Sequence, residues 1–302
     1  MNTLSKNVII PGFLIVILFS FDKPRLSPEQ GSTLKTIIID AGHGGRDVGA
    51  HGVYSYEKDI CLAIALKLGK KMEAKFPEIK ILYTRTSDVY PEIKARADFA
   101  NANKGDLFLS IHVNAAPPIS HSKFIGYRSE RYYTGKGKKK QKHTRKVPRF
   151  QFYYTPNPQN GTETYIWAAD RTEEKEKYVG TDLVSENNTI DSTEFIPDID
   201  GPETKAKALL WTKRFFDKSF LLASMVEEEF VKENRLSRGV KQRNEKGIWV
   251  LQATSMPSIL VETGFITYKE EEDFLNAEKG QEQVAENILT AVNNYIVATG
   301  GK

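Results

Sequence analysis

The sequence predicts an α/β fold in a single domain, with a mainly parallel, twisted sheet and helices on both of its faces. Short apolar runs alternate along the chain with longer segments in which apolar residues recur every three or four positions. This alternation is typical of strands that are connected by amphipathic helices. The 302 residues, of which 40% are hydrophobic and 27% charged, suffice to bury one large core. No internal repeat or linker divides the chain, so one domain is expected over residues 35–298.

The N-terminal part shows the alternation most clearly. Residues 35–40 (KTIIID) form a β-branched run that ends in the glycine-rich turn AGHGG, which indicates a buried strand and its following loop. Residues 58–75 place apolar side chains at steps of four, which predicts an amphipathic helix. The same reasoning predicts a strand at 79–84, a helix at 92–103 and a strand at 106–111. In the C-terminal part it predicts strands at 162–168, 247–252 and 258–262, and helices at 203–232 and about 279–297.

Residues 117–160 form an insertion of different composition. From Arg128 to Arg149 it carries ten Lys/Arg and one acid, Glu130, a net charge of +9, whereas the rest of the chain sums to −5 within a total of +4. We expect a solvated, disordered loop. The functional alternative is an electrostatic tether to an anionic envelope polymer or to a membrane surface. Nucleic acid is not expected as a partner, because nothing else in the chain supports it.

The first thirty residues are expected to direct export. Lys6 precedes an apolar stretch from Val8 to Phe21, which is shorter than the roughly 20 residues that span a bilayer. We interpret residues 1–30 as a secretory signal, with an uncleaved N-terminal anchor or a buried core strand as alternatives. The protein would then act in the periplasm or cell envelope. The one cysteine, Cys61, excludes an intramolecular disulfide and a cysteine-rich metal site, and we expect it to be buried.

Four residues that can carry chemistry lie near the ends of apolar runs that are far apart in the sequence: His43, Glu57, His112 and Glu262. Ligands of an open α/β sheet bind outside the carboxyl ends of its strands, so the four side chains are expected to meet at one edge. Two imidazoles and a carboxylate suit Zn²⁺ and leave one coordination position for water. A second carboxylate can act as general base. The set therefore predicts a zinc hydrolase.

Each residue of this set also has a structural explanation. His43 could serve a hydrogen bond in its loop, His112 could be a core histidine, and Glu57 could complement the dipole of a helix N-terminus. Glu262 is harder to explain, because a carboxylate buried in an apolar strand is costly without a partner. The turn AGHGG lacks the spacing of a phosphate-binding loop. No role is assigned to the remaining histidines, His51, His121 and His143.

Several spaced motifs carry a family resemblance: IIIDAGHGGRDVGA (37–50), YEKD (56–59), LYTRTSD (82–88), DLFLSIHVNAA (106–116), GTETY (161–165), GVKQ (239–242) and SMPSILVETGFIT (255–267). Over residues 35–116 and 161–298 the chain resembles the zinc-dependent N-acetylmuramoyl-L-alanine amidases of bacterial cell walls, the amidase_3 type with a phosphorylase/hydrolase-like fold. The resemblance implies that His43, Glu57 and His112 bind one Zn²⁺ and that Glu262 is the catalytic carboxylate. The family's DPGHGG is DAGHGG here and its VELGF is VETGF, and neither change touches a ligand.

The reaction that the resemblance implies is hydrolysis of the amide bond between N-acetylmuramic acid and L-alanine in peptidoglycan, in wall turnover or daughter-cell separation. In relatives, the region equivalent to 170–195 can form a helix that places a glutamate on the zinc until an activator protein moves it. Glu186 is the candidate for that glutamate here. Two rival functions stay open. A second ligand cluster would favour a zinc exopeptidase of similar fold, and loss of a ligand would favour a non-catalytic wall-binding or regulatory protein.

Three further residue roles follow from position in the sequence. Arg85 is a candidate for binding a stem-peptide carboxylate, although it could instead form a structural ion pair with Asp88. The zinc-binding histidines are expected to donate a hydrogen bond from their second ring nitrogen. Asp40 and Asn114 are the predicted acceptors.

Overall fold

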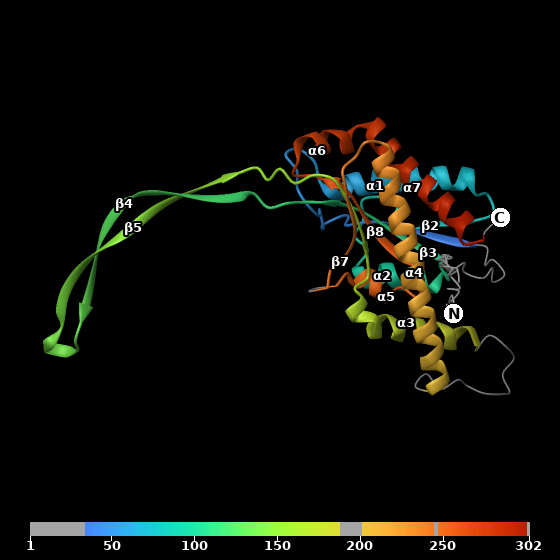
Figure 1. Cartoon of the computed structure of the whole chain (residues 1–302), viewed down its shortest axis with the longest axis horizontal. Coiled ribbons are helices and arrows are strands. Elements are labelled where there is room, and N and C mark those ends of the chain that lie inside the picture. Colours follow the sequence, from blue (N-terminus) through green and yellow to red (C-terminus); the bar gives the residue numbers. More distant parts are fainter. Residues whose placement is uncertain (1–33, 188–200, 245–246, 301–302) are drawn as a thin grey trace, which may run out of the picture.

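In the computed structural model, which describes residues 34–187, 201–244 and 247–300, a six-stranded sheet lies between two layers of helices (Figure 1). Its strands are β1 (Thr36–Ala41), β2 (Lys80–Tyr83), β3 (Leu107–Asn114), β6 (Thr162–Ile166), β7 (Ser237–Gln242) and β8 (Ser258–Phe265). The order across the sheet is β2-β1-β3-β8-β6-β7. The first four strands are parallel, β6 is antiparallel to β8, and β7 is parallel to β6. The predicted α/β fold with a mainly parallel sheet is confirmed.

Helices cover both faces of this sheet. One face packs mainly against α1 (Glu57–Lys75), α4 (Pro202–Lys232) and α7 (Glu278–Ala298). The other face packs mainly against α2 (Ile93–Ala102), α3 (Thr172–Asn187) and α5 (Trp249–Ala253). A short helix, α6 (Lys269–Asn276), leads into α7. Among the described residues, no helix combines the length and the apolar character that crossing a membrane requires.

The apolar run of β1 explains why this strand is central. Ile37, Ile38 and Ile39 are fully buried, and they divide between the two faces. Ile37 and Ile39 join the core under α1, whereas Ile38 joins the core under α2. A strand that is covered on both faces needs apolar residues at successive positions, and the run from Ile37 to Ile39 supplies them.

The predicted elements agree with the observed ones to within a few residues, with exceptions. Residues 247–252 were expected to form a strand, and this is wrong: they run into helix α5, which buries Val250 and Leu251 against α2. The four-residue apolar run from Ile248 to Leu251 does not distinguish a strand from a buried helical turn. The sheet is completed by β7, which contains the GVKQ motif and was not predicted, and α6 was also not predicted.

The basic insertion is ordered, so the expected disordered loop is wrong. Strands β4 (Ile119–Thr134) and β5 (Gln141–Thr155) pair antiparallel, with a 3₁₀ turn at Gly137–Lys139 between them. Tyrosine, phenylalanine and other β-forming residues along both strands outweigh the charge in deciding the local structure. Figure 1 shows this hairpin extending far from the body of the molecule. The proposed signal or anchor at residues 1–30 lies outside the described residues.

A buried ion pair joins the strands at the edge where β1 ends. Asp40 is 1% exposed and accepts hydrogen bonds from Arg96 Nη1 (2.7 Å), Thr84 Oγ1 (2.6 Å) and Ser110 Oγ (2.6 Å). Burial alone would raise the pKa of Asp40, but the Arg96 guanidinium and the two hydroxyl donors hold it below its usual value. One carboxylate thus links β1 to the end of β2, to β3 and to helix α2.

Replacing Arg96 with methionine should destabilise the protein strongly. The variant leaves the Asp40 carboxylate buried without its counter-ion, which typically costs about 3–5 kcal/mol. Urea denaturation measures the difference. Lys94→Met is the matched control, because Lys94 lies on the same helix in an exposed pair with Asp98 and should matter little. Equal effects of the two substitutions would contradict this account of the buried pair.

Candidate metal centre

The loop after β1 is held by two buried arginines that bind its backbone carbonyls. Arg85 donates to the carbonyls of Ala41 (2.9 Å) and Gly42 (2.7 Å), and Arg96 donates to those of Ala41 (2.6 Å) and His43 (2.6 Å). His43 itself has φ 57°, in the left-handed region that few residues other than glycine adopt. Three consecutive anchored carbonyls hold His43 in this conformation and direct its side chain to the sheet edge.

The predicted substrate contact of Arg85 is contradicted by this geometry. Arg85 is 3% exposed, and its guanidinium also donates to the carbonyls of Ser87 and Lys58. Its role is structural, although not through the alternative ion pair, because Asp88 bonds Lys58 Nζ at 2.6 Å and the Gly45 N–H at 2.7 Å. Arg85 therefore positions the loop that carries His43.

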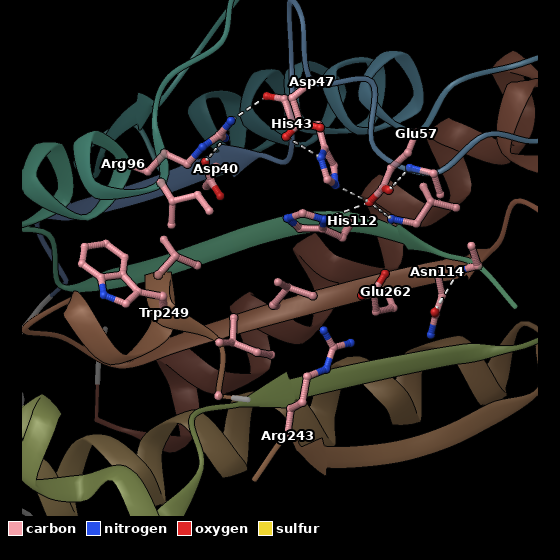
Figure 2. A pocket seen from close by; sticks show the side chains of 18 of the residues that line it. Asp40, His43, Asp47, Glu57, Arg96, His112, Asn114, Arg243, Trp249 and Glu262 are labelled. Carbon is pink, nitrogen blue, oxygen red and sulfur yellow. Dashed lines mark hydrogen bonds and ion pairs between the residues drawn. The ribbon is translucent and has the colours of Figure 1, made fainter. Parts of the chain in front are cut away.

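His43, Glu57 and His112 converge as the sequence predicts, and together they could hold one metal ion (Figure 2). Glu57 Oε1 lies 3.2 Å from His43 Nε2 and 2.9 Å from His112 Nδ1. The two imidazole rings meet edge to face, with their centroids 4.9 Å apart. Two imidazole nitrogens and one carboxylate oxygen form a donor set that suits Zn²⁺. No other such group of ligands is found among residues 34–187, 201–244 and 247–300.

Each of the three donors is oriented by the surrounding chain. Glu57 is the first residue of α1, and its carboxylate accepts the N–H of Ala50 (2.7 Å) and of Val113 (3.0 Å). His43 Nδ1 lies 2.9 Å from Asp47 Oδ2. A neutral ring that donates from Nδ1 to Asp47 keeps the lone pair of Nε2 for a metal.

The predicted acceptors for these histidines are therefore wrong. Asp40 is occupied by Arg96 and two hydroxyls, and Asn114 donates to Glu163 at 3.1 Å. Asp47, four residues after His43, was missed. Its position in the motif AGHGGRD is the only signal in the sequence that could have identified it.

Two glycines leave the space that the ligands occupy. A Cβ atom at Gly42 would lie 2.5 Å from the imidazole of His112, so the ring can pack against the backbone only at a glycine. Gly49 has φ 68°, and a Cβ there would lie 2.6 Å from Glu57 Oε2 and 2.7 Å from His43 Cδ2. The glycine-rich composition of this loop thus follows from the close approach of the ligands.

Glu262 faces the same pocket, and its Oε2 has no hydrogen-bond partner among the described residues. It lies on β8 directly beside His112 on β3, and the side chain is 8% exposed. Burial raises the pKa of Glu262 to about 7, and the negative charge of Glu57 adds to this effect, which the Arg243 guanidinium opposes only in part. The pocket has a volume of about 390 Å³. A buried carboxylate of raised pKa beside a ligand set is typical of a proton-transfer group.

A second carboxylate in the adjacent strand has the opposite environment. Glu163 pairs in register with Glu262 across β6 and β8, and it accepts bonds from Lys241 (2.7 Å), Arg238 and the Tyr165 hydroxyl (2.7 Å). Burial alone would raise its pKa, but the bonds from Lys241, Arg238 and Tyr165 keep it below the usual value. Glu163 is therefore a fixed negative charge, whereas Glu262 is able to exchange a proton.

Two further residues bear on access to the pocket. Arg243, just after β7, was missed by the sequence analysis; it lines the pocket and Figure 2 shows its guanidinium directed toward Glu262. Glu186 lies in the last turn of α3, and its side chain is outside the described part of the structure. Its role as a further ligand therefore stays a prediction.

Comparison with known proteins gives one consistent family. The family model for N-acetylmuramoyl-L-alanine amidase (Amidase_3) matches residues 37–294. AmiC of Escherichia coli O6:H1, named as an N-acetylmuramoyl-L-alanine amidase, is 30% identical over 260 residues, which cover 86% of this chain and 52% of that protein. AmiC of Neisseria meningitidis serogroup B is 28% identical over 90% of this chain and 55% of its own length. The chain thus spans about half the length of these relatives.

A solved structure shares the fold over nearly its full length. The N-acetylmuramoyl-L-alanine amidase of Clostridium difficile 630 aligns with a TM-score of 0.51 and 27% identity, covering 88% of this chain and 98% of that one. AmiC2 of Nostoc punctiforme aligns with a TM-score of 0.54 at 22% identity, and this similarity concerns the fold alone. Both agree with the α/β architecture described above.

Removing the Asp47 carboxylate should weaken metal binding without unfolding the protein. Asp47→Ala frees the ring of His43 to rotate and to change tautomer, and the loss of such a partner typically lowers metal affinity by about 10–100-fold. Isothermal titration with Zn²⁺ measures the change. Asp59→Ala removes one exposed charge from the same region and is the matched control. Equal affinities of the two variants would argue against the positioning role of Asp47.

The metal-free protein should lose stability as the pH rises, because of Glu262. Its pKa is about 7 in the folded state, compared with an ordinary value of 4.5, so the folded state retains a proton that the unfolded state releases between these values. The contribution of Glu262 to stability is therefore fully present below pH 4.5 and declines up to about pH 7. Glu262→Gln should abolish this part of the decline, which makes the variant more stable than the wild type above pH 7 by up to about 3 kcal/mol, whereas the decline caused by His43 at higher pH should remain in both proteins.

Urea denaturation in the presence of a chelator, at pH 5 and at pH 8, measures this difference. Glu163→Gln is the informative control. It should destabilise the protein at pH 8, because Lys241 and Arg238 lose their counter-ion. A Glu262→Gln effect that is the same at both pH values would contradict the raised pKa.

Proposed function

Because the chain belongs to the family of N-acetylmuramoyl-L-alanine amidases, whose model matches residues 37–294, we propose that it hydrolyses the amide bond between N-acetylmuramic acid and L-alanine in peptidoglycan. One observation carries the proposal. The buried carboxylate of Glu262, whose Oε2 has no partner within residues 34–187, 201–244 and 247–300, lies in the same pocket as three convergent metal ligands. A pocket with one metal and one proton-transfer carboxylate is suited to hydrolysis of an amide.

His43, Glu57 and His112 are the residues that would hold the metal, and we propose Zn²⁺. Two nitrogens and one oxygen match the ligand set of catalytic zinc sites, which leave a coordination position free. Bound Zn²⁺ would polarise the amide carbonyl and lower the pKa of a water molecule. Without metal, the bonds of His43 to Glu57 and Asp47 outweigh its burial and raise its pKa to about 9. Metal binding should therefore release a proton.

Glu262 is proposed to move the proton during the reaction. Its carboxylate accepts a proton from the attacking water and then gives it to the nitrogen of the leaving L-alanine. A group that titrates near neutral pH can perform both transfers, and no hydrogen bond from the part of the chain that the structure describes competes for Oε2. Glu163, held by Lys241 and Arg238, keeps Asn114 in place beside the pocket and does not exchange protons.

Arg243 takes the substrate-binding role that was first expected of Arg85. Its side chain is exposed and lines the pocket, and its guanidinium packs over the ring of Tyr165 at 5.1 Å from the centroid. The stem peptide that follows L-alanine carries carboxylates, which a guanidinium can bind with two parallel hydrogen bonds. We propose that Arg243 binds one of them and so orients the scissile amide.

Regulation by a covering helix is kept as a hypothesis. The start of α3 is fixed to the body, because Lys175 is fully buried and donates to the carbonyl of Leu251 at 2.7 Å. Glu186 at the other end of α3 is the candidate inhibitory ligand, and an activator protein would displace it. Absence of a rise in basal activity on deletion of residues 170–195, with the fold intact, would disprove the idea. The proposed location is the periplasm or cell envelope, in wall turnover or daughter-cell separation.

Mass spectrometry of digested peptidoglycan tests the reaction. The Zn²⁺-loaded protein should release intact stem peptides and leave glycan without peptides, whereas Glu262→Gln should release none above background. Peptides cleaved within the stem would instead identify a peptidase. Arg243→Gln should lower kcat/KM by roughly 10–100-fold on stems with a free carboxylate, as expected for a lost charged hydrogen bond. It should have little effect on stems in which that carboxylate is amidated.

A further inference from the structure

The hairpin formed by β4, its turn and β5, residues 119–155, is called the arm below. Figure 1 shows it projecting from the body, and its two strands pair mainly with each other. An isolated two-stranded ribbon is marginally stable in water, and both of its faces are open to solvent. We therefore expect a binding partner to cover one face of the arm and so to stabilise it.

The strand pairing sorts the arm's side chains into two faces. Residues paired across antiparallel strands lie on the same face, so alternate pairs define one face. A bulge at Ile125 and Gly126 keeps Phe124 and Tyr127 on one side, where their rings meet at 5.1 Å. One face, called the aromatic face below, carries six aromatic residues that are 48–68% exposed: Phe124, Tyr127, Tyr133, Phe150, Phe152 and Tyr154. The opposite face carries two tyrosines, Tyr132 and Tyr153, and each of them stacks on a histidine of the paired strand.

The arm is also strongly basic. It contains eleven Lys/Arg and one acid, Glu130, a net charge of +10, whereas the other residues of the chain sum to −6 within the total of +4. Four lysines gather at the turn: Lys136, Lys138, Lys139 and Lys140. Three further cations share the aromatic face by register: Arg131, Lys142 and Lys146.

We propose that the arm binds the surface of an anionic lipid bilayer, lying flat with its aromatic face against the lipid. Exposed phenylalanines beside lysines and arginines are the composition of interfacial membrane-binding elements. The cations meet the negative surface potential, while the rings enter the headgroup region. A hydrated anionic glycan could pair with the cations, but it offers no apolar phase that the exposed phenylalanine rings could enter, so a bilayer is favoured. Two arms side by side would bring like charges together, which disfavours a second copy.

This interaction would keep the proposed active site near the membrane. His112 on β3 lies seven residues before Ile119, the first residue of the arm, so the arm begins beside the pocket. The inference does not depend on the reaction. It concerns where the enzyme works, and a failure of either proposal leaves the other testable.

Environment-sensitive fluorophores on single cysteines test the orientation of the arm in the full-length chain. The native Cys61 is fully buried and should not be labelled. Ser122→Cys lies on the aromatic face opposite Phe152, and Gln151→Cys lies on the other face opposite Lys123. With vesicles of phosphatidylcholine containing roughly one-third phosphatidylglycerol, the probe at 122 should brighten several-fold, and the probe at 151 should change little. Pure phosphatidylcholine or about 0.5 M salt should abolish the response.

Replacing the four turn lysines by glutamine should lower the affinity for these vesicles by roughly 1,000-fold, without changing the circular dichroism spectrum. Equal responses of the two probes would show that another part of the chain binds the lipid and would overturn the proposal. A probe response to isolated peptidoglycan in the absence of lipid would identify a glycan partner instead. A response that depends on protein concentration alone would identify a second copy.

Discussion

The candidate site depends on backbone carbonyls that are held by two buried arginines. Arg85 and Arg96 bind the carbonyls of three consecutive residues, Ala41, Gly42 and His43, and so hold a loop whose histidine has a positive φ. This conformation costs a histidine on the order of 1 kcal/mol, which the bonds to the two arginines can offset. The counter-ion of Arg96 is Asp40, which also receives bonds from strands β2 and β3 through Thr84 and Ser110. The metal ligand is therefore tied to the sheet itself.

Two glutamates in neighbouring strands show how one sheet edge creates different chemistry. Glu163 and Glu262 pair in register, yet Lys241 and Arg238 neutralise only the first. Glu262 is left with an unbonded oxygen and a pKa near 7. Its burial costs stability whenever it is ionised, so the fold retains a destabilised group at the place where a proton must move. The two residues are both glutamates, so their different roles, a fixed charge at Glu163 and proton transfer at Glu262, follow from the partners of each carboxylate.

The sequence predicted those features that depend on long periodic segments and on strand ends. Parallel strands and their helices follow from apolar spacing, and His43, His112 and Glu262 could be placed at one edge because strand ends meet there. Contacts that depend on exact loop conformation were not predictable. Asp47, and not Asp40 or Asn114, lies beside His43 because of the left-handed turn. Arg85 was assigned to substrate because nothing in the sequence shows that its guanidinium is enclosed by carbonyls.

Short or unusually charged segments were predicted least well, for two physical reasons. The run at 247–252 is as compatible with the helical turn of α5 as with a strand. The basic insertion suggested disorder, because net charge opposes compaction, but a two-stranded ribbon does not need a compact core. Its aromatic residues favour extended pairing, which keeps the like charges spread along its length.

The arm also gives the molecule a large electric dipole. Strand β4 has 16 residues and so spans about 50 Å. The arm carries a charge of +10, whereas the described residues outside it sum to −4, so an anionic surface attracts one end of the protein and repels the other. The electric field of such a surface therefore orients the protein, with the arm toward the surface, before the two make contact. The same separation means that cation and anion exchangers each find a complementary region at neutral pH, and the isoelectric point of 8.8 describes neither of them.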